Sequence, residues 1–123
     1  MKRVLALLTA GMLATASALD IAQRGKPADC SIVIPENAAK PYVSAANELQ
    51  QFMEEITGVK LPIVTDAAAL PAKAVLIGPN KHSKTLLKQD YKPESLGDDS
   101  YLMKTVGKRL VLLGNQRGGQ YAV

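Results

Sequence analysis

Apolar residues recur every three or four positions between residues 41 and 57, which is the spacing of one face of an α-helix. Pro41 stands at the start of this stretch, where its missing N–H costs nothing, and Gly58 follows its end, where a left-handed residue ends many helices. The pattern therefore predicts one long amphipathic helix that packs on a neighbouring layer. Its expected apolar stripe is formed by Tyr42, Ala45, Ala46, Leu49, Phe52, Met53 and Ile56.

Short runs of apolar and β-branched residues predict strands on both sides of this helix. A first short strand is expected over 19–22, followed by a buried strand over 30–34. The run 61–65 predicts a strand whose Pro62 places it at an edge or at a strand entry. The continuous apolar run 74–77 predicts a central strand that is covered on both faces.

The second half of the chain predicts a short helix and a β-hairpin. Ser83 is expected to be the N-cap of a helix over 83–87. Two strands, 101–106 and 109–113, are separated by Gly107-Lys108, a pair that fits a type II′ or type I′ turn. Residues 120–123 look like the start of a further helix, which favours the interpretation that this is the front part of a longer protein. Together these elements predict an α+β domain with a mixed sheet, one long helix and one or two short helices.

The first 18 residues have the organisation of a cleavable export signal. Lys2 and Arg3 form a positive start, an apolar run over 4–13 follows, and small residues at Ala16 and Ala18 fit two cleavage positions. A membrane anchor and a buried N-terminal helix are the alternatives, but the apolar run is shorter than the roughly 20 residues that span a bilayer. We therefore expect cleavage after Ala18, a single domain over 19–123, and a secreted or periplasmic protein.

The composition excludes some classes of function. The net charge of +4 includes Lys2 and Arg3, so the exported part carries about +2 (4 − 2), without a dense basic run. This charge is too small and too dispersed to indicate a nucleic-acid interface. The chain has no Trp, one Phe and four Tyr, which weakens the case for a glycan-binding module that stacks sugars on aromatic rings.

The residues that could carry nucleophilic or metal chemistry are few and scattered. His82 is the single histidine, and its neighbour Ser83 is not part of a Gly-x-Ser-x-Gly motif. Cys30 is the single cysteine and lies far from His82, so a zinc site is not expected. The cysteine is expected to be a small buried residue on a strand, with pairing between chains as the alternative.

Paired acidic residues offer no convincing catalytic arrangement. Glu54 and Glu55 are adjacent on the predicted helix and diverge by about 100°, as on a solvated face. Asp98 and Asp99 precede a strand, where a polar turn is the simpler interpretation and cation binding the alternative. The glycine-rich stretch 114–119 lacks a phosphate-binding motif. Within it, Arg117 is the one residue that we single out as a possible ligand contact, because it could present a cation to a carboxylate.

Several motifs together resemble a known family. They run from a strand ending Ile-Pro, through a helix ending Glu-Ile-Thr-Gly, to a hairpin and a final Arg-Gly-Gly-Gln-Tyr, over residues 32–35, 45–52, 55–64, 75–79, 96–101, 106–114 and 117–123. This arrangement resembles the non-catalytic N-terminal domain of α-glucuronidases of glycoside hydrolase family 67. It is also similar to the domain before the barrel in family 20 β-N-acetylhexosaminidases and in bacterial secreted proteins of similar layout.

The resemblance implies a zincin-like topology without the zinc centre, placed ahead of a C-terminal catalytic (β/α)₈ barrel. The family's catalytic carboxylates have no matching positions here, so no catalytic residue, metal or cofactor is expected. The leading hypothesis is an accessory domain of a secreted glycoside hydrolase, with the catalytic domain of the same polypeptide as its partner. The alternatives are a stand-alone secreted glycan-binding module, with polysaccharide as its partner, and a small exported hydrolase that uses His82.

Overall fold

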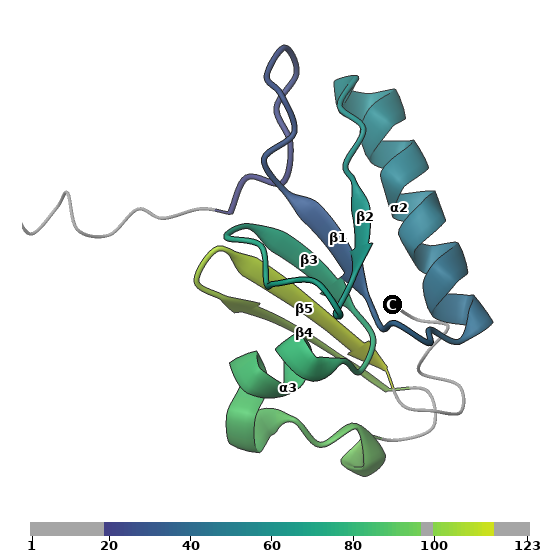
Figure 1. Cartoon of the computed structure of the whole chain (residues 1–123), viewed down its shortest axis with the longest axis vertical. Helices are drawn as coiled ribbons and strands as arrows, with labels where there is room; N and C mark the ends of the chain where they lie inside the picture. The colour runs from purple at the N-terminus through teal and green to yellow at the C-terminus, as the bar shows by residue number, and fades with distance from the viewer. Residues whose placement is uncertain (1–18, 97–99, 115–123) are drawn as a thin grey trace, which may run out of the picture.

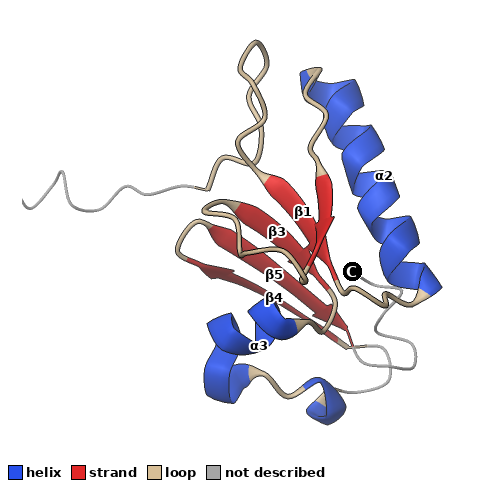
Figure 2. Cartoon of the chain, viewed as in Figure 1, coloured by secondary structure: helices blue, strands red, loops and turns tan. Residues whose placement is uncertain are grey.

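The computed structural model describes residues 19–96 and 100–114, and these residues form one mixed sheet with helices on both faces (Figures 1 and 2). The strands are ordered β2-β1-β3-β5-β4, and all are parallel to their neighbours except β4, which pairs antiparallel with β5. The predicted α+β class with a mixed sheet is thereby confirmed. The strands are β1 (Ser31–Ile34), β2 (Ile63–Thr65), β3 (Ala74–Ile77), β4 (Tyr101–Val106) and β5 (Arg109–Gly114).

Helix α2 (Lys40–Thr57) is the long helix that the sequence predicts. Gly58 adopts a left-handed conformation with φ of 76°, and its N–H donates to the carbonyl of Glu54, which ends the helix as expected. The predicted stripe is only partly buried, however: Tyr42 is buried, whereas Phe52 is 55% and Ile56 64% exposed. The expectation that the whole stripe packs on the sheet is wrong at Phe52 and Ile56.

The central strand β3 divides the core into two layers. Its side chains alternate between the faces, so that Val75 and Ile77 lie under α2 while Ala74 and Leu76 lie under helix α3 (Lys81–Leu87). All four are buried, which confirms the prediction of a strand covered on both faces. Strand β2 lies at the sheet edge and begins directly after Pro62, so both of the positions that the proline allowed are observed. After α3, the chain forms two 3₁₀ turns, η1 (Lys88–Asp90) and η2 (Pro93–Ser95).

Two local predictions need correction. Residues 19–22 form no strand, because Ile21 and Ala22 pack their side chains against the core on the α2 side instead of pairing with a sheet edge. Helix α3 begins at Lys81 and is capped by Asn80, whose side chain accepts a hydrogen bond from the Ser83 N–H at 2.8 Å. Ser83 therefore lies inside the helix rather than at its cap.

The hairpin is confirmed and its turn type is resolved. Gly107 has φ of 62°, whereas Lys108 is not among the residues with positive φ, so the pair fits a type II′ turn. Among the described residues, no helix combines the length and the apolar character needed to cross a membrane.

Candidate functional site

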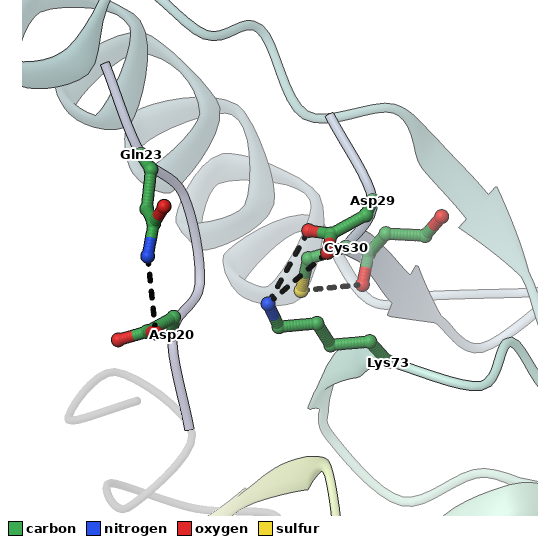
Figure 3. A network of polar contacts seen from close by, with 6 residues as sticks. Asp20, Gln23, Asp29, Cys30 and Lys73 are labelled. Carbon is green, nitrogen blue, oxygen red and sulfur yellow. Dashed lines mark hydrogen bonds and ion pairs between the residues drawn. The ribbon is translucent and has the colours of Figure 1, made fainter. Parts of the chain in front are cut away.

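Polar side chains gather at the two ends of the sheet, and the first group, here called the amino-end cluster, lies where β1 and β3 begin (Figure 3). The parallel register pairs Ser31 with Ala74, which brings the preceding Asp29 and Lys73 side by side. The Lys73 Nζ lies 3.3 and 3.4 Å from the two carboxylate oxygens of Asp29. Asp20 and Gln23, joined by a 3.1 Å hydrogen bond, complete the cluster.

The amino-end cluster borders a shallow hollow of about 390 Å³, which Lys26 and Pro27 also line. The Asp29 side chain is 71% exposed and that of Lys73 16% exposed, so the ion pair stays in contact with solvent and contributes little stability. The exposed carboxylates and ammonium groups can form hydrogen bonds with a ligand rich in hydroxyl groups. They do not resemble the buried acid and base pair of a hydrolase.

Cys30 lies beside this hollow but is not part of its surface. The side chain is 1% exposed, and its thiol is free. Burial raises the pKa of the thiol, and the nearby charge of Lys73 acts in the opposite direction without cancelling the rise. Cys30 is therefore a buried apolar residue, as the sequence predicts, and a poor nucleophile.

The second group, the carboxyl-end cluster, lies where β1, β2 and β3 end. In open parallel sheets, ligands bind where neighbouring strands lead their connections to opposite faces, which here is between β1 and β3. Asp66 stands at this end and is 8% exposed. Its two oxygens accept the backbone N–H groups of Glu36 at 2.8 Å and Lys81 at 3.0 Å.

The hydrogen bonds of Asp66 decide its charge state. Burial alone would raise the pKa of its carboxyl, but the amides of Lys81 and Glu36, with the positive charge of Lys81 and the proximity of His82, outweigh burial and lower it. Asp66 is therefore a charged residue whose acceptor capacity is used to join the end of β1 to the start of α3. Its neighbour Asn80 is used in the same way as a helix cap.

The predicted catalytic candidates do not come together. A ring nitrogen of His82 lies 2.8 Å from the carbonyl oxygen of Ala68 and donates to it. The hydroxyl of the adjacent Ser83 is fully buried and donates to the carbonyl of Gly78 at 3.0 Å. A histidine and serine engaged with separate carbonyls do not form a nucleophile and base pair.

The remaining candidates are either exposed or outside the described residues. Glu54 and Glu55 lie on the exposed side of α2, as expected, and Glu55 accepts from a neighbouring glutamine. Asp98, Asp99 and Arg117 lie outside the described residues. Within residues 19–96 and 100–114, no group of three or more histidine, cysteine or acidic side chains is placed to hold a metal ion.

Sequence reasoning did not single out Asp66 or the Asp29–Lys73 pair. Asp66 follows a predicted strand directly, which is a position where functional side chains often lie, and this was the available signal. The pair joins residues 44 positions apart, and only the strand register brings them together.

Another ion pair lies beyond α3, where the Nζ of Lys104 is 2.7 Å from a carboxylate oxygen of Asp90. The hydrogen bond from Lys104 and its positive charge hold the pKa of Asp90 below its ordinary range.

Comparison with known proteins gives one finding. The family model described as the N-terminus of glycosyl hydrolase family 67 matches residues 18–123, which include every described residue. No curated protein matches the chain. The match confirms the resemblance on which the sequence-based interpretation rests.

Proposed function

Because the chain belongs to the family of N-terminal domains of glycosyl hydrolase family 67, we propose that it is the accessory domain of a secreted, α-glucuronidase-like hydrolase. A family of this kind implies a catalytic domain in the same polypeptide. The role that we propose for the accessory domain is to pack on that catalytic domain and support its site, without contributing catalytic residues.

The observation that carries this proposal is the family match, and the distribution of acidic residues supports it. Glycoside hydrolysis requires two carboxyl groups about 5 to 10 Å apart on either side of the bond. Among the described residues, Asp29 lies at the amino end of the sheet, Asp66 at its carboxyl end and Asp90 beyond α3. Asp20 shares the hollow of the amino-end cluster with Asp29, but the two carboxylates accept from Gln23 and Lys73 as exposed surface groups, so they do not resemble the acid and base pair of a hydrolase.

The test is an activity assay on the 123-residue chain and on the complete enzyme. Both would be incubated with aryl glucuronides and aryl N-acetylhexosaminides, and the released aryl alcohol would be measured. We expect turnover of a glucuronide by the complete enzyme and none by the 123-residue chain. Turnover by the 123-residue chain alone would refute the non-catalytic role.

A stand-alone glycan-binding module is the second candidate, and the amino-end cluster is the observation that favours it. Its hollow presents Asp20, Asp29 and Lys73 together, which could bind sugar hydroxyl groups. The test is titration calorimetry of the 123-residue chain against plant polysaccharides. Saturable binding that is lost in Lys73→Met, but kept in the control Lys60→Met, would support this module.

The same proposal includes export and the topology that the resemblance implies. The family match begins at residue 18, next to the predicted cleavage position after Ala18, which supports a cleaved signal. N-terminal sequencing of the exported protein is expected to begin at Leu19. The mixed sheet with one long helix on one face supports the zincin-like topology without a zinc centre, and comparison of an experimental structure with zincin folds would test it.

A further inference from the structure

The parallel strands β1, β3 and β5 begin at the same edge of the sheet, and two lysines lie side by side there (Figure 2). The register pairs Ser31 with Ala74 and Ala74 with Arg109. Lys73 and Lys108 come directly before Ala74 and Arg109, and the Ala74 N–H donates to the carbonyl of Lys108 at 3.3 Å. Because neighbouring strands lie about 5 Å apart, the two lysines start from adjacent backbone positions.

A carboxylate neutralises one of these two lysines but not the other. The Lys73 Nζ lies 3.3 Å from a carboxylate oxygen of Asp29, in the contact that Figure 3 shows. The described residues contain two ion pairs, Lys73–Asp29 and Lys104–Asp90, and neither involves Lys108. Like charges at opposed positions of neighbouring strands repel each other. An anion beside Lys108 would therefore stabilise this edge of the sheet.

The space beside Lys108 is a hollow that adjoins the one already described. It has a volume of about 350 Å³, and its neighbour has about 390 Å³. Asp20, Asp29 and Lys73 line both hollows, Lys108 lines the second and Lys26 lines the first. Each volume lies within the range of small-molecule sites. We call the two hollows together the amino-end groove.

The charges of the amino-end groove select the chemistry of a ligand. Three ammonium groups, those of Lys26, Lys73 and Lys108, face the two carboxylates of Asp20 and Asp29, which leaves an excess of positive charge. The carboxylates repel a densely charged anion such as phosphate, but they accept hydrogen bonds from hydroxyl groups. A ligand that carries singly charged anionic groups among many hydroxyl groups satisfies both conditions.

We propose that the amino-end groove binds an acidic saccharide, with Lys108 contacting its anionic group and Asp20 and Asp29 accepting hydrogen bonds from its hydroxyl groups. The inference rests on the second candidate function, glycan binding, and goes beyond it by assigning the charge of the ligand and the residue that recognises this charge. A neutral saccharide leaves the Lys108 ammonium without an anionic partner and therefore binds more weakly.

The test is titration calorimetry of the 123-residue chain at low ionic strength, because salt screens exposed charges. The two probes are a short oligogalacturonate and the same oligomer with its carboxyl groups converted to methyl esters. We expect saturable binding of the acid and at least about threefold weaker binding of the neutral ester, the size typical of an exposed ion pair. A carrageenan oligosaccharide, measured in parallel, shows whether a sulfate ester replaces the carboxylate.

Lys108→Met tests the residue that recognises the charge. We expect it to weaken binding of the acid at least about threefold and to leave binding of the ester unchanged, whereas Lys108→Arg keeps the charge and should restore the preference. Lys84→Met is the matched control, because Lys84 is an exposed lysine on α3, outside the amino-end groove. Lys108 is itself exposed in the hairpin turn, so unchanged urea unfolding is expected in all three variants.

The outcomes separate this inference from the function on which it rests. Equal affinity for the acid and the ester would overturn the charge preference and leave a glycan-binding module in place. An equal loss of affinity in Lys84→Met and Lys108→Met would show unspecific attraction to surface lysines and would also overturn it. Absence of binding to every saccharide tested would overturn both the inference and the glycan-binding module, while the role as an accessory domain would stand.

Discussion

The contact between Tyr42 and Gly78 should make Gly78 the least replaceable of the four described glycines that have positive φ. Gly78 has φ of 83°, and a Cβ at this position would lie 3.0 Å from Cδ1 and 3.1 Å from Cε1 of the Tyr42 ring. The ring is itself fixed, because Tyr42 is buried in the first turn of α2. A methyl group here must therefore displace either the helix or the end of β3.

The cost of Gly78→Ala has two parts that can be separated. A left-handed conformation costs an alanine about 1 to 2 kcal/mol, and overpacking a dense core costs about 1 to 3 kcal/mol. We therefore expect a loss of about 2 to 5 kcal/mol. Gly58 has φ of 76° with no atom within 4 Å of the added Cβ, so Gly58→Ala should show the conformational part alone, about 1 to 2 kcal/mol.

The assay is urea unfolding followed by far-UV circular dichroism, which suits a chain without tryptophan. Tyr42→Ala combined with Gly78→Ala completes the cycle, because removal of the ring should reduce the cost of the added methyl to its conformational part. A loss in Gly78→Ala no larger than that in Gly58→Ala would refute the contact between ring and backbone.

Three further predictions concern the polar groups. Asn80→Ala should destabilise the domain by about 1 kcal/mol in urea unfolding, because it removes the cap of α3. Asp66→Asn should also destabilise it. Because the folded protein lowers the pKa of Asp66, the stability lost in this variant should be fully present above the ordinary pKa of about 3.9. The stability difference between parent and variant should disappear as the pH falls through the lowered pKa that Asp66 has in the folded state. Unfolding curves of the two proteins that stay separated at low pH would contradict this. Cys30 should react with a thiol reagent only at the rate of unfolding, because its thiol is buried with a raised pKa, and rapid labelling of the folded protein would contradict its position.

The elements that were predicted correctly are those specified by local signals. Helix α2 is bounded by a proline and a glycine, β3 is a continuous apolar run, and the hairpin has glycine at its turn. The error at the cap of α3 arose because two local signals competed. Asn80 and Ser83 are both good capping residues, and the strand end at Ile77 with its turn at Gly78 selected Asn80.

The candidate site was less predictable, because its geometry depends on contacts distant in sequence. The Asp29–Lys73 pair requires the register of β1 on β3, and no local pattern encodes it. The role of Asp66 depends on amides from two other segments. Periodicity placed Phe52 and Ile56 on the apolar stripe of α2, but it could not show that both side chains remain more than half exposed in the folded domain.

The direction of the carboxyl pKa shifts supports a structural role for Asp66 and Asp90. A general acid in glycoside hydrolysis needs a raised pKa, so that it still holds its proton near neutral pH. Asp66 and Asp90 are the described carboxyl groups with resolved shifts, and in both the pKa is lowered by hydrogen bonds and nearby positive charge. Such groups are stabilised as anions and release their protons well below neutral pH. Their chemistry therefore suits the joining of strand ends and loops, and it does not suit these two groups to act as a general acid.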